Sequence, residues 1–117
     1  MDEQEFKHRT KRLALHVIKL VEELPRSRTA EVLGRQLLRS GTSAGANYRS
    51  ACRGKSTADV LAKLAIVEEE ADETIYWLEL LVEAKIVAES RVVELTKETN
   101  ENVAMTVASI KTLRGRR

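Results

Sequence analysis

Apolar residues recur every three or four positions in four successive stretches of this chain. In the first stretch Phe6, Leu13, Val17 and Leu20 follow this spacing, which places them on one face of an α-helix. Pro25 ends the stretch, because the residue before a proline is pushed out of the helical region. The same spacing predicts helices over residues 5–24, 28–52, 57–84 and 90–113.

The second predicted helix contains a stretch of glycine and small polar residues between Ser40 and Ala46. Propensity alone predicts a loop there, because glycine costs ~1 kcal/mol relative to alanine inside a helix. The apolar stripe nevertheless keeps its phase from Leu33 to Ala51. We therefore predict that the helix continues, and that the small side chains let a neighbouring helix approach closely.

Short connections between the helices determine the predicted fold class. Ser56 followed by Asp59 has the spacing of a capping box at the start of the third helix, and Ser90 can cap the fourth. Connections of only a few residues favour antiparallel packing of consecutive helices. We predict an all-α fold, an antiparallel up-down four-helix bundle, with residues 1–117 forming a single domain.

Several classes of function find no support in the sequence. Gly54, Lys55 and Ser56 resemble the end of a phosphate-binding loop, but the earlier glycine that such a loop needs is replaced by Arg49. His16 is expected on the helix surface, and Cys52 is expected to be a small buried residue. We predict no enzyme, no cofactor and no metal site.

The expected location is the cytoplasm. Cys52 is the single cysteine and has no partner for an internal disulfide, which favours a reducing compartment. No apolar run approaches the ~18 residues that a membrane span requires.

Charge is sorted by position along the chain. Residues 26–55 contain seven lysines or arginines and one acid, whereas residues 56–101 contain twelve acids and four lysines or arginines. The net charge of +2 is therefore the remainder of two opposed local charges. This sorting indicates partners of opposite sign, either nucleic acid or other copies of the same chain.

The basic segment forms a row on one helix. At 100° per residue its arginines fall within ~80° of one another, opposite the apolar stripe. The row, followed by Lys55, consists of Arg28, Arg35, Arg39, Arg49 and Arg53. It is interpreted either as a phosphate-binding surface, for which the planar guanidinium is well suited, or as a solvated face partly neutralised by acids of a neighbouring helix.

The third helix has a second apolar face in addition to its core face. This face contains Ile66, Tyr76, Trp77 and Leu80, with Glu69 and Glu73 between them. A helix that is apolar on two sides usually has two neighbours, and Trp and Tyr are common at protein interfaces. We expect self-association through this face; the alternative is that these are isolated exposed apolar residues.

Two sequence blocks resemble a known family. Residues 36–40 (QLLRS), followed by Ser43 and Asn47, and residues 70–78 (EADETIYWL) are similar to the bacterial four-helix bundle proteins encoded in intervening sequences of 23S ribosomal RNA genes. The resemblance extends from about Phe6 to Leu113. The resemblance implies a bundle that assembles into a ring-like homopentamer. A related accessory protein of diversity-generating retroelements shares this architecture and binds RNA and DNA through its basic surface. Ser43 and Asn47 are expected to hydrogen-bond to a facing helix, for example to Glu70 or Glu73.

Two hypotheses about function follow. In the first, the protein is oligomeric and non-enzymatic and binds the phosphates of nucleic acid, with RNA as the expected ligand by family analogy. The nucleic-acid contacts would come from Arg28, Arg35, Arg39, Arg49, Arg53 and Lys55. In the second, it is a protein–protein scaffold or adaptor with no nucleic-acid role, and the arginines contact other subunits or an acidic partner.

Overall fold

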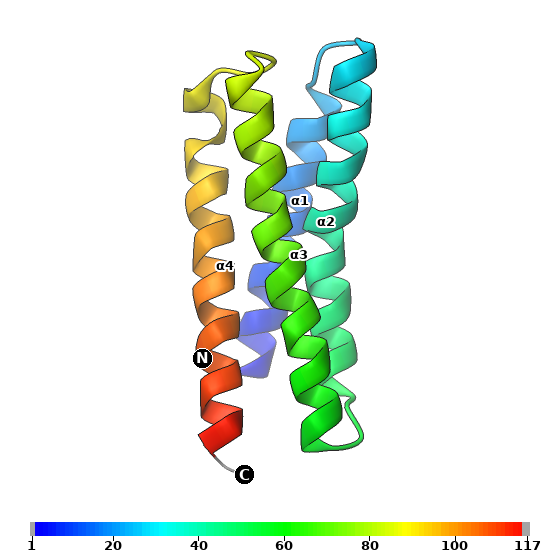
Figure 1. Ribbon diagram of the computed structural model, residues 1–117. Helices are drawn as coiled ribbons and strands as arrows, with labels where there is room; N and C mark the ends of the chain where they lie inside the picture. The colour runs from blue at the N-terminus through cyan, green and yellow to red at the C-terminus, as the bar shows by residue number, and fades with distance from the viewer. Residues whose placement is uncertain (1, 116–117) are drawn as a thin grey trace.

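The computed structural model describes residues 2–115, which fold into four α-helices. These are α1 (Glu3–Glu22), α2 (Arg28–Cys52), α3 (Thr57–Glu83) and α4 (Glu89–Gly115). Consecutive helices run antiparallel and form an elongated bundle of 48 × 21 × 21 Å (Figure 1). The predicted all-α, up-down four-helix architecture is therefore confirmed.

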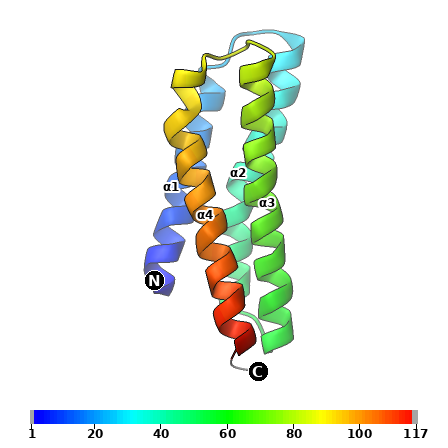
Figure 2. The ribbon, with the colours of Figure 1, turned by 60° about the vertical axis from the view of Figure 1, so that its left-hand side comes forward.

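Each helix packs against two neighbours. α2 and α3 contact each other most extensively, α1 packs on α2, α4 packs on α3, and α1 closes the bundle against α4 with the sparsest contacts. Figure 2 shows that α1 begins short of the bundle end formed by the α2–α3 connection and the end of α4. Among the described residues, no helix combines the length and apolar character needed to cross a bilayer.

Side-chain oxygens of Asp2, Ser27 and Ser56 cap the first three helices. At α3, Ser56 Oγ accepts from the Asp59 N–H at 3.1 Å, as expected. The Asp59 carboxylate does not return to Ser56 as in a capping box; it accepts from the N–H of Lys55 at 3.0 Å. That bond lowers the pKa of Asp59 and pairs an N–H just outside the helix.

The α3–α4 connection is a tight reversal around Lys85. The Ile86 N–H donates to the Leu81 carbonyl at 3.0 Å, and Lys85 has φ of 62°, the left-handed conformation of a Schellman-type helix end. α4 then begins at Glu89, so the prediction that Ser90 is the N-cap is wrong. Because the chain reverses within so few residues, Ser90 already lies inside the first turn of α4.

Two apolar clusters fill the two halves of the bundle. The cluster toward the α1–α2 and α3–α4 connections consists of Leu13, Val17, Leu20, Leu37, Leu78, Leu81, Val92 and Leu95. The cluster toward the α2–α3 connection consists of Phe6, Ala44, Tyr48, Ala51, Leu64, Val67 and Ile110. Phe6 and Tyr48 stack there with ring centroids 3.9 Å apart.

Small polar residues are also buried inside the bundle. Thr10, Ser40, Thr74, Thr99, Asn102 and Thr106 are each at most 1% exposed. Most of these side chains bond to a carbonyl of their own helix, as Thr99 does to Leu95 at 2.7 Å. Thr74 and Ser40 also bond to each other across α3 and α2, at 2.8 Å between their hydroxyl oxygens. Such pairing avoids the cost of burying an unpartnered hydroxyl.

The glycine-rich stretch of α2 is helical, as predicted, and its two glycines, Gly41 and Gly45, face α1. A Cβ atom added at Gly41 would lie 2.8 Å from Val17 Cγ2, and one added at Gly45 would lie 3.2 Å from Thr10 Oγ1. The glycines therefore permit the close packing of α1 on α2. This packing turns the opposite side of α2 toward solvent.

Candidate nucleic-acid interface

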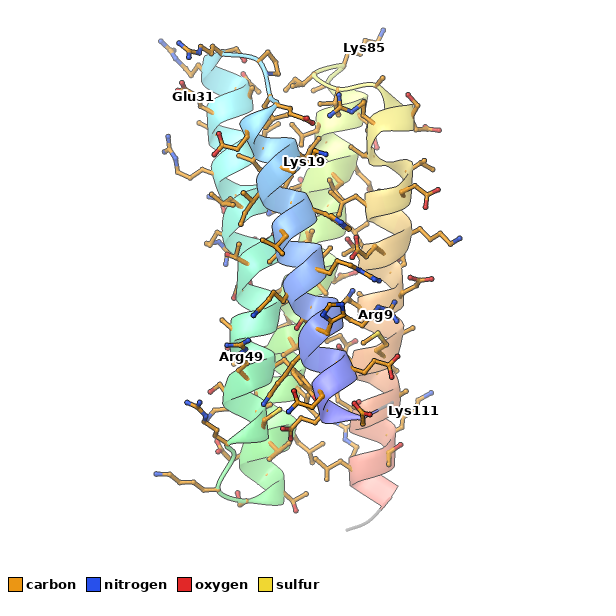
Figure 3. All side chains as sticks on the ribbon, turned by 180° about the vertical axis from the view of Figure 1, so that it is seen from behind. Arg9, Lys19, Glu31, Arg49, Lys85 and Lys111 are labelled. Atoms are coloured by element: carbon orange, nitrogen blue, oxygen red, sulfur yellow. The ribbon has the colours of Figure 1, made fainter. Side chains whose placement is uncertain are left out.

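The solvent-facing side of α2 holds most of the predicted basic residues. Arg28, Arg35, Arg49 and Arg53 are exposed, as is Lys55 just after the helix. None of the five has a carboxylate within ion-pair distance among residues 2–115. In Figure 3, Arg49 lies on α2, on the other side of the bundle from Lys111 of α4.

Arg39 differs from the other arginines of the row. Its guanidinium donates from Nη1 to Glu70 Oε2 at 2.9 Å and from Nη2 to Glu73 Oε1. At Arg39 the row is neutralised by acids of a neighbouring helix, as its second interpretation expects. The reason is spatial: α3 packs beside α2 and presents two carboxylates, one helical turn apart, within reach of this one side chain.

The contact between Arg39 and Glu73 shifts the pKa of both residues. The hydrogen bond to Glu73 is the main cause of the raised pKa of Arg39, and the same bond lowers the pKa of Glu73. The Arg39 side chain is 48% exposed, so this pairing stabilises the fold by at most about 1 kcal/mol. Its larger effect is on the surface potential, because a cation in the middle of the row is neutralised.

The pairing of Arg39 divides the row into two groups. The N-terminal cluster consists of Arg28 and Arg35, and the C-terminal cluster consists of Arg49, Arg53 and Lys55. From Arg35 to Arg49 the helix rises ~21 Å at ~1.5 Å per residue. Between these clusters the surface carries Arg39 with the two carboxylates that bind it.

The second apolar face of α3 is only partly open. Ile66 is 40% and Tyr76 is 53% exposed, whereas Trp77 and Leu80 are half-buried. Trp77 packs against the apolar cluster of the α1–α2 end, and its Nε1–H donates to Glu73 Oε1 at 3.1 Å. Trp77 is therefore partly a core residue, and Ile66 and Tyr76 are the members most available to a partner.

Glu69 and Glu73, the two acids of this face, have different surroundings. Glu69 is exposed, whereas Glu73 is held by Arg39 and Trp77. The basic row and the apolar face, which the sequence separates, are thus adjacent on the outer side of α2 and α3.

Ser43 and Asn47 do not reach the facing helix. Asn47 Nδ2 donates to the Ser43 carbonyl and to Ser43 Oγ, both at 2.9 Å. The expected bonds to Glu70 or Glu73 are absent, and the donor of Asn47 is used within its own helix. The two motif residues form a local bond within α2.

The sequence did not reveal a charged interface between α1 and α4. Glu98 is 9% exposed, and its carboxylate contacts His16 Nδ1 at 2.7 Å and Arg12 Nε at 3.4 Å. Arg9 pairs with Glu101 at 3.1 Å nearby, and Figure 3 places Arg9 between the two helices. His16 is a surface residue as expected, but it is paired. The one feature of the sequence that could have indicated this interface is the position of Glu98 on the buried stripe of α4.

An open cavity of about 760 Å³ lies at the bundle end that α1 leaves uncovered. Tyr48, Cys52, Leu64 and Met105 are among the residues that line it. Burial raises the pKa of the Cys52 thiol, which disfavours the reactive thiolate. Among the described residues, no three His, Cys, Asp or Glu side chains are grouped so that they could hold a metal ion.

Comparison with known proteins decides the family. The profile described as 23S rRNA-intervening sequence protein matches residues 2–108. The chain belongs to this family. A crystal structure from Bacteroides thetaiotaomicron VPI-5482, described as a protein with unknown function from the S23 ribosomal protein family, is 34% identical in sequence. The similarity covers 91% of this chain and 98% of that chain, with a TM-score of 0.85. No curated protein matches the chain significantly.

Family membership explains the bundle and agrees with the resemblance carried by residues 36–47 and 70–78. As a member of the 23S rRNA-intervening sequence protein family, the chain has a solved relative with the same fold over nearly its full length. The description of that relative states no activity. The function of this chain must therefore be argued from its own surface.

Proposed function

We propose that this protein is a non-enzymatic, cytoplasmic RNA-binding protein that contacts phosphates through the outer side of α2. The observation that carries the proposal is the set of five exposed cations on α2 and just after it, with no carboxylate in ion-pair range within residues 2–115. Like charges on one helix face repel each other. An anionic ligand with repeated charges relieves that repulsion, and arginine binds phosphate oxygens in a bidentate manner.

The aromatic residues favour contacts to phosphates over contacts to bases. Phe6 and Tyr48 stack on each other inside the bundle, and Trp77 is half-buried. Tyr76 alone among the aromatic side chains of the described residues is exposed, whereas non-specific single-strand binders generally offer several stacking platforms. Binding should therefore depend little on sequence.

We also propose that the protein assembles with copies of itself, in a ring-like homo-oligomer that the family resemblance suggests is a pentamer. Ile66 and Tyr76 supply exposed apolar surface on α3, and the exposed Glu69 lies on the same face. A ring would present the basic surface of α2 several times to one nucleic acid. Such repetition strengthens binding without new kinds of contact.

The alternative is a protein–protein scaffold with no nucleic-acid role. One observation favours it: Arg39 is already used in a contact with α3, the helix that carries the exposed Tyr76. In this alternative the remaining arginines of the row would bind carboxylates of another subunit or of an acidic partner.

A charge-reversal experiment separates the two functions. Replacing Arg35, Arg49 and Arg53 by Glu should abolish the gel shift of a labelled RNA at low salt and leave the helical circular dichroism unchanged. The matched control replaces Lys11, Lys85 and Lys111 by Glu, because these exposed lysines lie on other parts of the bundle and give the same change in net charge. Equal loss of RNA binding in both variants would reject a specific role for α2, and absence of binding by the unaltered protein would favour the scaffold.

A further inference from the structure

The basic surface of α2 is interrupted by acidic groups at its centre. The N-terminal cluster (Arg28, Arg35) and the C-terminal cluster (Arg49, Arg53, Lys55) are separated by ~21 Å of helix. Glu70 and Glu73 border that interval and bind Arg39. One arginine and two carboxylates meet there, so the interval has no net positive charge to offer a ligand.

A single strand laid along α2 fits this pattern poorly. Phosphates follow one another every ~3.4 Å along a stacked strand. About six of them would lie over the interval, close to the carboxylates of Glu70 and Glu73 and without a free cation. Only the two ends of the strand segment would be neutralised.

A duplex fits the pattern better, because its phosphates lie in two backbones with a groove between them. The B-DNA major groove is about 12 Å wide, and A-form RNA has a wide, shallow minor groove. Long arginine side chains that start ~21 Å apart on a helix can lean toward two such backbones. The carboxylates of Glu70 and Glu73 would then lie over the groove, away from the phosphates.

We infer that α2 recognises double-stranded nucleic acid, with its two basic clusters on the two backbones that border one groove. This inference rests on the proposed function and narrows its ligand from nucleic acid in general to a duplex. The shared chemistry is a pair of phosphate backbones, which both an RNA duplex and a DNA duplex supply. A continuous α2 helix holds the two clusters at a fixed separation, as recognition of a stiff duplex requires.

The direct test compares four ligands of one sequence: an RNA duplex, a DNA duplex and the corresponding single strands. A length of about 20 base pairs exceeds that of the bundle at ~3.4 Å per pair. Fluorescence anisotropy at one low salt concentration should give at least one duplex an affinity five-fold or more above that of its own strands. The RNA and DNA arms identify which duplex geometry is preferred.

A second test gives the interval between the two clusters a net positive charge. The variant E70Q/E73Q removes both ion pairs of Arg39 and two negative charges, so the charge of Arg39 joins the two clusters into one row. Single-strand affinity should rise more than duplex affinity, and the ratio between them should fall at least two-fold. The control E79Q/E83Q makes the same charge change on exposed residues of α3 that line its groove with α4, and it should leave the ratio unchanged.

The outcomes of the two tests are distinct. Equal or tighter binding of single strands by the unaltered protein overturns the duplex inference and leaves RNA binding through α2 intact. Absence of binding to all four ligands overturns both proposals. If E70Q/E73Q and E79Q/E83Q change the ratio of duplex to single-strand affinity equally, the role of the interval is overturned. The comparison of the four ligands uses the unaltered protein, so it stands even if a variant fails to fold.

Discussion

Arg39 of α2 donates to the Glu73 carboxylate of α3, and Trp77 Nε1–H donates to the same carboxylate at 3.1 Å. This contact joins the basic and acidic segments of the sequence within one chain. Part of the charge sorting is therefore satisfied internally, along the interface between α2 and α3. What is left for a partner is the two outer clusters of α2 and the exposed apolar residues of α3.

The Glu73 contact predicts a specific response to acid. Because its folded-state pKa is lowered, Glu73 stabilises the fold fully above the ordinary glutamate pKa of ~4.3, and this contribution is lost as pH falls through the lower folded-state pKa. Urea unfolding from pH 7 to pH 3 should show less acid destabilisation for Glu73→Gln than for the unaltered protein. Identical pH profiles would show that the contact is not formed in solution.

Close packing of α1 on α2 predicts the effect of filling Gly41. Alanine would gain ~1 kcal/mol in helix propensity, but its Cβ would meet Val17 Cγ2 at 2.8 Å, and overpacking of this kind costs ~1–3 kcal/mol. We expect Gly41→Ala to lower the free energy of unfolding by about 1 kcal/mol, measured by urea titration. Gly45→Ala, with more room, should cost less. A more stable Gly41→Ala protein would contradict the observed helix separation.

The left-handed conformation of Lys85 predicts a stabilising substitution. A residue with a Cβ atom is strained at positive φ by ~1–2 kcal/mol, and glycine is not. Lys85→Gly should raise the free energy of unfolding by about 1 kcal/mol. Lys85→Ala is the control, because it removes the charge but keeps the Cβ. Equal stability of the two variants would mean that charge, not backbone conformation, is responsible.

The buried Glu98 predicts that packing matters more than ion pairing between α1 and α4. Its partners Arg12 and His16 have side chains 45% and 52% exposed, so they remain solvated if Glu98 is replaced. Glu98→Leu should stay within about 1 kcal/mol of the unaltered protein or exceed it, whereas Glu98→Ala should lose about 1–2 kcal/mol to a cavity. Urea unfolding measures both. Equal losses would show that the ion pairs hold this interface.

The four helices and their core faces could be predicted because they depend on spacing along one helix at a time. Leu13, Leu37 and Leu78 are fully buried on stripes that the sequence already displays. The partner of Arg39 could not be predicted in the same way, because it depends on how α3 lies beside α2. The burial of Glu98 and the positive φ of Lys85 likewise arise from the tertiary arrangement.

The salt dependence of RNA binding shows whether the cations of α2 bind phosphates. If five cations of one subunit neutralise about five phosphates, log affinity should fall against log salt with a slope of about −3.5 on single-stranded RNA, and more steeply if several subunits bind one RNA. The variant R49Q/R53Q should lower the magnitude of that slope by about 1.4 per bound subunit. A slope near zero, or an R49Q/R53Q slope equal to that of the unaltered protein, would contradict phosphate binding by α2.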